Sequence, residues 1–196
     1  MKATILLGTL KKTGLSNTET LCEFLEARLE KEGVACERIK LVDYDIPPGT
    51  YSDMGAGDDW PAILAKVLES GIVIFATPIW WDHHSSLIQR VIERLDELHD
   101  QVLAGKPSPL EGKVGGIVIT GDSDGAQHII GSLCNFFNAL GLLVPPYATL
   151  SVLAEIQAKS AHPEKSDLLR KYESDYAETA DRMIRQLLQY APRATS

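Results

Sequence analysis

Short apolar runs alternate with amphipathic segments along the chain, and this alternation restricts the possible folds more than any other feature. Residues 71–77 (GIVIFAT) and 113–120 (KVGGIVIT) are continuous apolar runs of strand length, which is typical of strands buried on both faces. Alternation of strands and helices predicts a parallel sheet covered by helices on both faces. The predicted strands span residues 2–7, 34–42, 71–77, 113–120 and 142–150, and the predicted helices span 18–33, 60–70, 85–103, 126–140 and 163–190.

The predicted fold class is therefore α/β, a doubly wound five-stranded parallel sheet in one domain that covers residues 1–196. Both common strand orders of doubly wound sheets fit this pattern. In such sheets ligands bind beyond the carboxyl ends of the strands, close to the point where the strand order reverses. The functional site should thus be built from the loops after the first, third and fourth strands, at residues 8–18, 77–86 and 120–128.

The charge and the composition exclude several classes of function. The chain of 196 residues has a formal net charge of -8, whereas a general nucleic-acid binder needs a basic face. It shows neither an apolar stretch of about 18 residues nor a signal-peptide pattern. The three cysteines are widely spaced and form no C-x-x-C pair, which argues against a disulfide framework or a metal cluster. We therefore expect a cytoplasmic protein without a bound metal and without nucleic-acid or membrane partners.

The first of the three loops, GTLKKTGLSNT, is small, polar and basic. It matches neither the G-x-G-x-x-G nor the G-x-x-x-x-G-K-[ST] pattern. Ser16, Asn17 and Thr18 lie where the loop meets the next helix, and the unpaired N–H groups of a helix N-terminus favour an anion there. Lys11 or Lys12 would add a countercharge. The alternative is that Ser16 or Thr18 only caps the helix while the lysines face solvent.

The second loop, ATPIWWDHHSS, carries two adjacent tryptophans after a proline that fixes the backbone. Trp80 and Trp81 would form a wall for a planar ligand ring, or they would pack in the core or at an interface. The two adjacent histidines that follow point apart, which does not suit metal ligation. Asp82 or Ser85 is a candidate cap for the next helix.

The third loop, TGDSDGAQH, is rich in glycine and acidic residues. Asp122 and Asp124 would form an acid pair or a Mg²⁺ site, or they would serve only in turns and capping. His128, in the first turn of the next helix, faces either the site or solvent. A Ser/His/Asp triad is not indicated because the sequence has no G-x-S-x-G pattern.

Taken together, these loops resemble those of the NAD(P)H-dependent FMN reductases, within the flavodoxin-like superfamily. The matching segments are LLGTLKKTGLSNT, ATPIWWDHHSSLIQRVIERLDEL and IVITGDSDGAQHI, followed by FFNALGLLVPP, so that the resemblance covers about residues 1–150. It implies a flavodoxin-like sheet with the strand order 2-1-3-4-5. It also implies FMN as the cofactor, NAD(P)H as the co-substrate, and assembly into a homodimer or homotetramer.

The resemblance further implies a set of cofactor-binding residues. Thr9, Lys11, Ser16, Asn17 and Thr18 would surround the FMN phosphate; Pro78, Ile79, Trp80 and Trp81 would border the isoalloxazine ring and ribityl chain; Thr120, Gly121, Asp122 and Gly125 would line the other edge of the ring.

Two positions depart from the family pattern. Lys11 stands where arginine is common, which removes bidentate recognition of the phosphate. Asp82 stands where glycine is common, and its carboxylate would disfavour an anionic reduced flavin.

The implied activity is hydride transfer from NAD(P)H to flavin N5 and onward to a small-molecule acceptor such as a quinone or a flavin. No side chain needs to act as an acid or a base, so we assign no catalytic residue. Two alternatives use the same fold. One is a flavodoxin-type electron carrier without its own NAD(P)H turnover, and the other is an interaction protein that binds no flavin.

Overall fold

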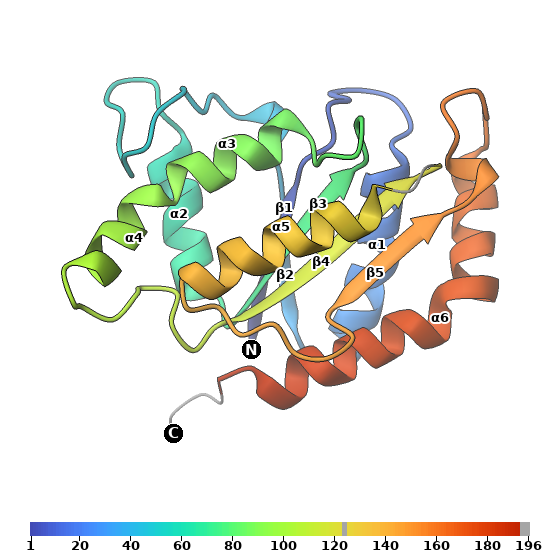
Figure 1. Cartoon of the computed structure of the whole chain (residues 1–196). Coiled ribbons are helices and arrows are strands. Elements are labelled where there is room, and N and C mark those ends of the chain that lie inside the picture. The colour runs from blue at the N-terminus through green and yellow to red at the C-terminus, as the bar shows by residue number, and fades with distance from the viewer. Residues whose placement is uncertain (123–124, 193–196) are drawn as a thin grey trace.

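The structure is a computed structural model that describes residues 1–122 and 125–192. Five strands form one sheet in the order β2-β1-β3-β4-β5, with every adjacent pair parallel, which confirms the predicted fold class and strand order (Figure 1). The strands are β1 (Lys2–Leu7), β2 (Ala35–Lys40), β3 (Ile72–Pro78), β4 (Val114–Gly121) and β5 (Thr149–Leu153). The helices are α1 (Asn17–Lys31), α2 (Trp60–Glu69), α3 (Ser86–Arg94), α4 (Asp96–Leu103), α5 (Ala126–Ala139) and α6 (Lys165–Tyr190), with short 3₁₀ helices at η1 (Leu41–Asp43) and η2 (Glu155–Gln157).

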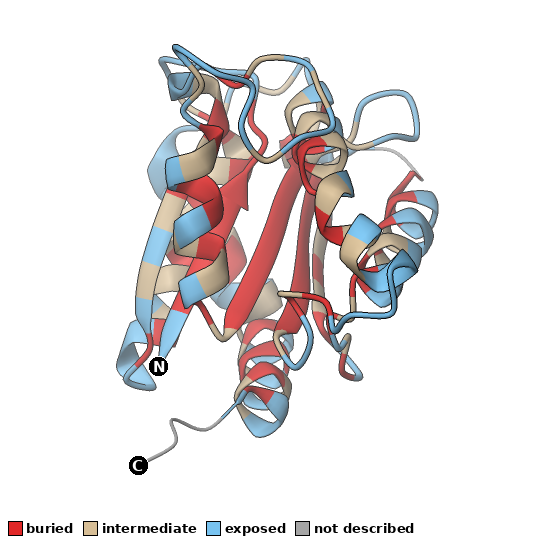
Figure 2. Cartoon of the chain, turned by 90° about the vertical axis from the view of Figure 1, so that its left-hand side faces the viewer, coloured by how far each residue is buried: buried red, intermediate tan, exposed pale blue. Residues whose placement is uncertain are grey.

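Helices cover both faces of the sheet and create two cores. One core joins α1 and α6 to the sheet and includes Leu21 and Leu187. The other joins α2, α3, α4 and α5 to the opposite face and includes Trp60 and Phe75. β3 and β4 are buried at nearly every position, as their apolar runs predicted, and Figure 2 shows the buried strands between the helices. None of the described helices is long and apolar enough to cross a membrane.

The fifth strand begins later than the sequence predicted. A strand was expected over residues 142–150, but β5 spans Thr149–Leu153. Before it, Leu143 forms only an isolated parallel bridge to β4. Pro145 and Pro146 have no backbone N–H to donate, so a continuous ladder cannot form until the chain has passed them. β5 does lie at the edge of the sheet, as the prolines indicated.

The long helix predicted over residues 85–103 is divided at Leu95 into α3 and α4. The Leu95 N–H donates to the carbonyls of both Val91 and Ile92, and the Leu98 N–H donates to the Leu95 carbonyl at 3.1 Å. These short spacings are typical of a 3₁₀ turn. Val91, Leu95 and Leu98 are all buried, so the apolar face continues through the turn and the periodicity gives no sign of it.

A buried ion pair fastens the loop of residues 43–59 to α3. The side chains of Arg94 and Asp58 are both 0% exposed, and Arg94 Nη2 lies 2.5 Å from Asp58 Oδ2. Arg94 also donates from Nε to the Tyr51 carbonyl at 2.8 Å and from Nη1 to the Pro47 carbonyl at 3.2 Å. The guanidinium is therefore satisfied by one carboxylate and two backbone carbonyls, which fixes the loop against the helix.

The protein should lose stability as the pH falls through the range between 3.8 and about 2. The Arg94 guanidinium, helped by the backbone N–H groups of Met54 and Trp60, lowers the pKa of the Asp58 carboxyl from its ordinary 3.8 to about 2. Because the folded pKa is depressed, this stabilisation is complete above the unfolded value and is lost when the carboxylate is protonated. Denaturant unfolding at several pH values measures it, and Asp58→Asn should lack this component. Equal pH slopes for the wild type and the variant would contradict the assignment.

Candidate functional site

A crevice of about 790 Å³ lies at the carboxyl end of the sheet, where the loops after β1, β3, β4 and β5 converge. All of the predicted site residues except Gly125 line it: Thr9, Lys11, Ser16, Asn17 and Thr18 from the first loop, Pro78, Ile79, Trp80 and Trp81 from the second, and Thr120, Gly121 and Asp122 from the third. Segments that are far apart in the sequence thus meet around one cavity. The cavity lies at the switch point of the sheet, where β2 and β3 extend the sheet in opposite directions from β1.

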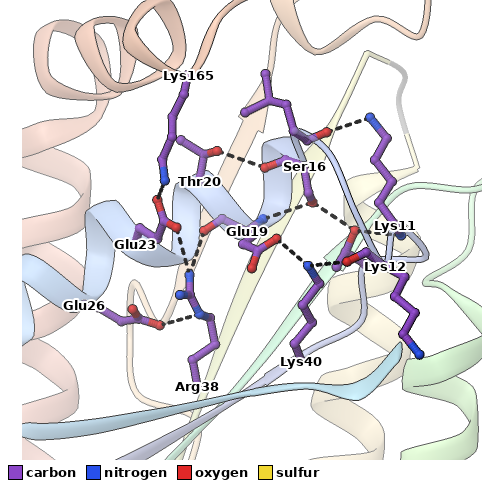
Figure 3. A network of polar contacts seen from close by, with 12 residues as sticks. Lys11, Lys12, Ser16, Glu19, Thr20, Glu23, Glu26, Arg38, Lys40 and Lys165 are labelled. Atoms are coloured by element: carbon purple, nitrogen blue, oxygen red, sulfur yellow. Dashed lines mark hydrogen bonds and ion pairs between the residues drawn. The ribbon is translucent and has the colours of Figure 1, made fainter. Parts of the chain in front are cut away.

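The loop after β1 is held in shape by hydrogen bonds at the start of α1 (Figure 3). Ser16 is the N-cap of α1, because its Oγ accepts from the Glu19 N–H at 3.2 Å. The same hydroxyl donates to Thr9 Oγ1 at 2.8 Å, and Lys11 Nζ donates to the Leu15 carbonyl at 2.8 Å. The capping role of Ser16 is therefore observed, while its contact with a phosphate stays a prediction.

The only acidic side chain in the first turn of α1 is neutralised by a neighbouring strand. Lys40 Nζ lies 2.9 Å from Glu19 Oε2 and donates to the Lys12 carbonyl at 3.2 Å (Figure 3). Pairing with Lys40 reduces the repulsion that Glu19 would exert on an anion at this helix N-terminus. Of the two lysines in the loop, Lys11 lines the crevice. Lys11 is thus the better candidate for the countercharge.

A hydrogen bond between two threonines joins the first loop to the third. Thr18 Oγ1 and Thr120 Oγ1 are 2.7 Å apart, and the two residues are 2% and 3% exposed. One hydroxyl donates and the other accepts, so both are satisfied without water. This contact fixes the start of α1 against the end of β4 on the floor of the crevice.

The loop after β3 is a tight turn with backbone strain. The Trp80 N–H donates to the His83 carbonyl at 2.8 Å and the His83 N–H donates back at 2.9 Å, while Trp81 and Asp82 between them have φ values of 49° and 64°. A residue other than glycine in this left-handed region costs roughly 1–3 kcal/mol, and such strain clusters at functional sites. Trp80 is 40% and Trp81 92% exposed, so neither packs in the core. Ser85, rather than Asp82, caps α3.

Two glycines in the third loop allow this strained turn to approach it closely. A Cβ on Gly121 would lie 2.8 Å from Ile79 Cδ1, and a Cβ on Gly125 would lie 2.6 Å from Asp82 Cα. The contact at Gly125 is with backbone, so that position requires glycine, whereas at Gly121 the Ile79 side chain would have to move. Gly125 supports the packing of the two loops and does not line the cavity itself.

Three histidines lie near the site, two of them in an edge-to-face pair and the third, His84, half-buried beside them. The rings of His83 and His128 meet edge to face with centroids 4.8 Å apart. Burial lowers the pKa of His84, and the neighbouring His83 and His128 lower it further. Within residues 1–122 and 125–192, no group of three or more His, Cys, Asp or Glu side chains is placed to hold a metal ion. Asp124, the sequence-predicted partner of Asp122, lies outside the described residues.

The loop between β5 and α6 also lines the crevice, although no sequence pattern indicated this. It contributes Gln157, Ala158, Lys159, Ala161, His162 and Pro163. Lys159 Nζ lies 5.9 Å from the centroid of the Trp80 ring, within the range of a cation–π contact. The rule that all parallel strands end at the same edge could have identified this loop. The predicted strand 142–150 ended before the observed end of β5 at Leu153, so the segment that follows β5 was not recognised as a loop at this edge of the sheet.

The sheet order defines the chain as a flavodoxin-like protein, and its crevice lies at the strand-order reversal. It belongs to the NADPH-dependent FMN reductase family, whose sequence model matches residues 1–155. The resemblance seen in the three loops is thereby confirmed. Members of this family are flavin-dependent oxidoreductases that use FMN with NAD(P)H as the co-substrate.

Two curated relatives are similar to most of this chain. One is the 8-demethyl-8-aminoriboflavin-5'-phosphate synthase of Streptomyces davaonensis, which is 34% identical over 158 residues that make up 76% of this chain and 62% of the synthase. The other is described as the divalent metal cation transporter MntH of Mycobacterium bovis, which is 32% identical over 160 residues that make up 79% of this chain and 23% of that protein. The chain thus spans less than two thirds of the length of either relative.

Among solved structures, the crystal structure of RosB with the bound intermediate 8-demethyl-8-formylriboflavin-5'-phosphate is similar to nearly the whole chain. Its TM-score is 0.78 and its sequence identity 29%, over 97% of this chain and 78% of the RosB chain. The apo NADH:FMN oxidoreductase EMOB, with a TM-score of 0.67 and 15% identity over 98% of this chain and 91% of its own, shares the fold.

Proposed function

We propose that the protein is an FMN-dependent NAD(P)H oxidoreductase that passes hydride from nicotinamide to flavin N5 and on to a small-molecule acceptor such as a quinone or a flavin. We further propose that residues 1–196 act as one FMN-binding domain, in the cytoplasm, as a homodimer or homotetramer. The observation that carries the proposal is the crevice in which the three predicted loops meet, in a chain that belongs to the NADPH-dependent FMN reductase family.

The residues of the crevice suit FMN in three respects. Its volume of about 790 Å³ lies within the range of small-molecule sites. At one end, hydroxyl groups and Lys11 surround the N-terminus of α1, which favours a dianionic phosphate. At the other end, the adjacent indoles of Trp80 and Trp81 offer apolar surface for a flat ring. The crevice thus offers polar groups where the phosphate would lie and apolar surface where the ring would lie.

Each group of residues has a distinct task in this proposal. Ser16, Asn17 and Thr18 bind the phosphate and fix the position of the ligand along the crevice. Trp80 restricts the ring to one plane, and the strained turn beside it is held by two backbone hydrogen bonds and by its close approach to Gly125. Bound FMN supplies the redox chemistry, so the chain contributes binding, orientation and exclusion of water. We assign no side chain to proton transfer.

Turnover measurements distinguish this proposal from the electron-carrier alternative. The protein is loaded with FMN, and NADPH or NADH is added with a soluble quinone in excess. We expect sustained nicotinamide oxidation at many turnovers per flavin, with bleaching of the oxidised flavin band when the quinone is left out under anaerobic conditions. Bound FMN that neither nicotinamide reduces would contradict the enzyme proposal and favour a carrier. A protein that binds no FMN would favour the interaction protein.

Trp80→Ala should weaken FMN binding by about 10-fold, because stacking of a flat heterocycle on an aromatic side chain contributes roughly 1–3 kcal/mol. Flavin fluorescence titration measures the change. Trp80 is 40% and Trp81 92% exposed, so Trp81→Ala on the same turn should have the smaller effect. Affinity for ribitol 5-phosphate, which has the phosphate but no ring, should stay the same in Trp80→Ala. An equal loss for both ligands would show that Trp80 does not contact the ring.

A second candidate function is favoured by the similarity to the flavin-modifying synthase. A chain that is 34% identical to that enzyme over 76% of its own length, and similar to RosB with a TM-score of 0.78, is a candidate for an enzyme that uses riboflavin 5'-phosphate as a substrate. Mass spectrometry of the flavin released after prolonged aerobic incubation with an amino acid as the nitrogen donor distinguishes the two functions. An oxidoreductase returns unmodified FMN, whereas a synthase releases a flavin of altered mass.

A further inference from the structure

A buried glutamine in the β5–α6 loop has an unused acceptor beside the crevice. Gln157, in η2, is 7% exposed and lines the cavity. Its Nε2 donates to the Tyr172 hydroxyl at 3.1 Å. Its Oε1 is buried and has no hydrogen-bond partner in the described part of the chain. A buried carbonyl oxygen without a partner is costly, so this atom calls for a donor that residues 1–122 and 125–192 do not provide.

The orientation of the Gln157 amide follows from the hydroxyl that it contacts. The Tyr172 hydroxyl donates its hydrogen to the Asn17 carbonyl at 3.3 Å, and a hydroxyl has only one hydrogen to give. Towards Gln157 it must therefore accept, which requires the amide NH₂ on that side and leaves Oε1 on the other. Burial raises the pKa of Tyr172 to about 12, so the hydroxyl keeps its hydrogen at neutral pH.

The same chain of hydrogen bonds locates Gln157 along the crevice. Through Tyr172 it is joined to Asn17, the first residue of α1, at the end where the phosphate is expected. The ligand group opposite Oε1 must be a donor, which excludes the phosphate oxygens and the ring carbonyls. Oxidised FMN with a dianionic phosphate has donors only at the ribityl hydroxyls and at ring N3–H, and N3 lies at the end of the molecule opposite the phosphate.

We infer that Gln157 is a ligand-binding residue of the crevice, whose Oε1 accepts a hydrogen bond from a ribityl hydroxyl of FMN. This inference rests on the proposed use of FMN. It gives a specific ligand contact to the β5–α6 loop, which lines the crevice together with the loops after β1, β3 and β4. The Asn17–Tyr172–Gln157 chain sets the acceptor in place before the ligand arrives, so Gln157 selects for a polyol chain rather than for the ring.

Gln157→Met tests this with three flavins that differ in one part each. Methionine has nearly the shape of glutamine but no acceptor of comparable strength. FMN has the ring, the ribityl chain and the phosphate; riboflavin lacks the phosphate; lumiflavin has the ring alone. Titrations followed by flavin fluorescence should show about 5- to 10-fold weaker binding of FMN and of riboflavin, because one buried hydrogen bond is lost. The affinity for lumiflavin should be unchanged.

The controls separate a contact with the ligand from a structural role. Tyr172→Phe keeps Gln157 but frees its amide to rotate, so it should weaken FMN and riboflavin by a smaller factor and again spare lumiflavin. If the Gln157→Met protein is less stable but binds all three flavins as the wild type does, the residue is structural and the inference is wrong. Equal loss for lumiflavin, or a loss for FMN but not for riboflavin, also overturns it. A wild-type protein that binds none of the three flavins would instead refute the proposed function.

Discussion

Replacing Ser16 by aspartate is expected to weaken FMN binding by at least about 100-fold while the protein remains folded. The new carboxylate would lie at the N-terminus of α1, where the phosphate dianion is expected. Two unit charges 4 Å apart repel by about 4 kcal/mol at an effective dielectric constant of roughly 20, which exceeds the roughly 2.7 kcal/mol that corresponds to 100-fold. Folding should persist because aspartate caps helices as well as serine does, and it would accept the same Glu19 N–H.

Ser16→Asn is the matched control for this experiment. Asparagine has the size of aspartate and caps helices equally well, but it carries no charge. Its affinity for FMN should therefore stay within about 10-fold of the wild type, and riboflavin, which has no phosphate, should bind the aspartate variant much better than FMN does. Flavin fluorescence titration gives both affinities, and circular dichroism checks the fold. Unchanged FMN affinity in Ser16→Asp would refute this placement of the phosphate.

The second large effect concerns the buried pair of Arg94 and Asp58. Arg94→Leu should lower the free energy of unfolding by about 3–5 kcal/mol, because it leaves the fully buried Asp58 carboxylate without its countercharge. For a chain of this size the melting temperature should fall by at least about 6 °C. The loop that Arg94 ties down through the Pro47 and Tyr51 carbonyls should also become accessible to protease.

An exposed ion pair provides the comparison for that prediction. Arg170 pairs with Asp167 at 3.3 Å, and their side chains are 75% and 42% exposed. Arg170→Leu should therefore change the stability by less than about 1 kcal/mol. The double variant Arg94→Leu/Asp58→Leu should recover part of the loss, since no unpaired buried charge remains. Equal melting temperatures for Arg94→Leu and Arg170→Leu would show that the buried pair has no special importance.

The sequence was sufficient to predict the central sheet. β3 and β4 are buried on both faces, and a strand in that environment must be apolar at every position, so the runs at 71–77 and 113–120 were unambiguous. The strand order came from the resemblance of the loops, because the pattern alone allowed two orders. The division of the predicted helix 85–103 at Leu95 was not predictable in this way. Its apolar residues keep the same spacing whether the segment forms one helix or two, so the sequence pattern could not show the break.

The site was predictable where residue type and position in the fold agreed. Ser16 and Trp80 lie in the loops that follow the buried strands β1 and β3, and the rule for parallel sheets brings such loops together. Gln157 and Lys159 were not predicted as site residues. The prolines before β5 shift that strand towards the C-terminus, so nothing in the local pattern marked the two residues as lining a cavity. The strain at Trp81 was also invisible, since a positive φ depends on the turn that the flanking hydrogen bonds impose.

The most direct test of the central claim is a crystal structure of the protein grown with excess FMN. We predict the phosphate at the N-terminus of α1 beside Ser16 and Thr18, with the ring between the turn at Trp80 and the end of β4. A crevice filled by the protein's own side chains, or FMN bound elsewhere on the molecule, would contradict the account.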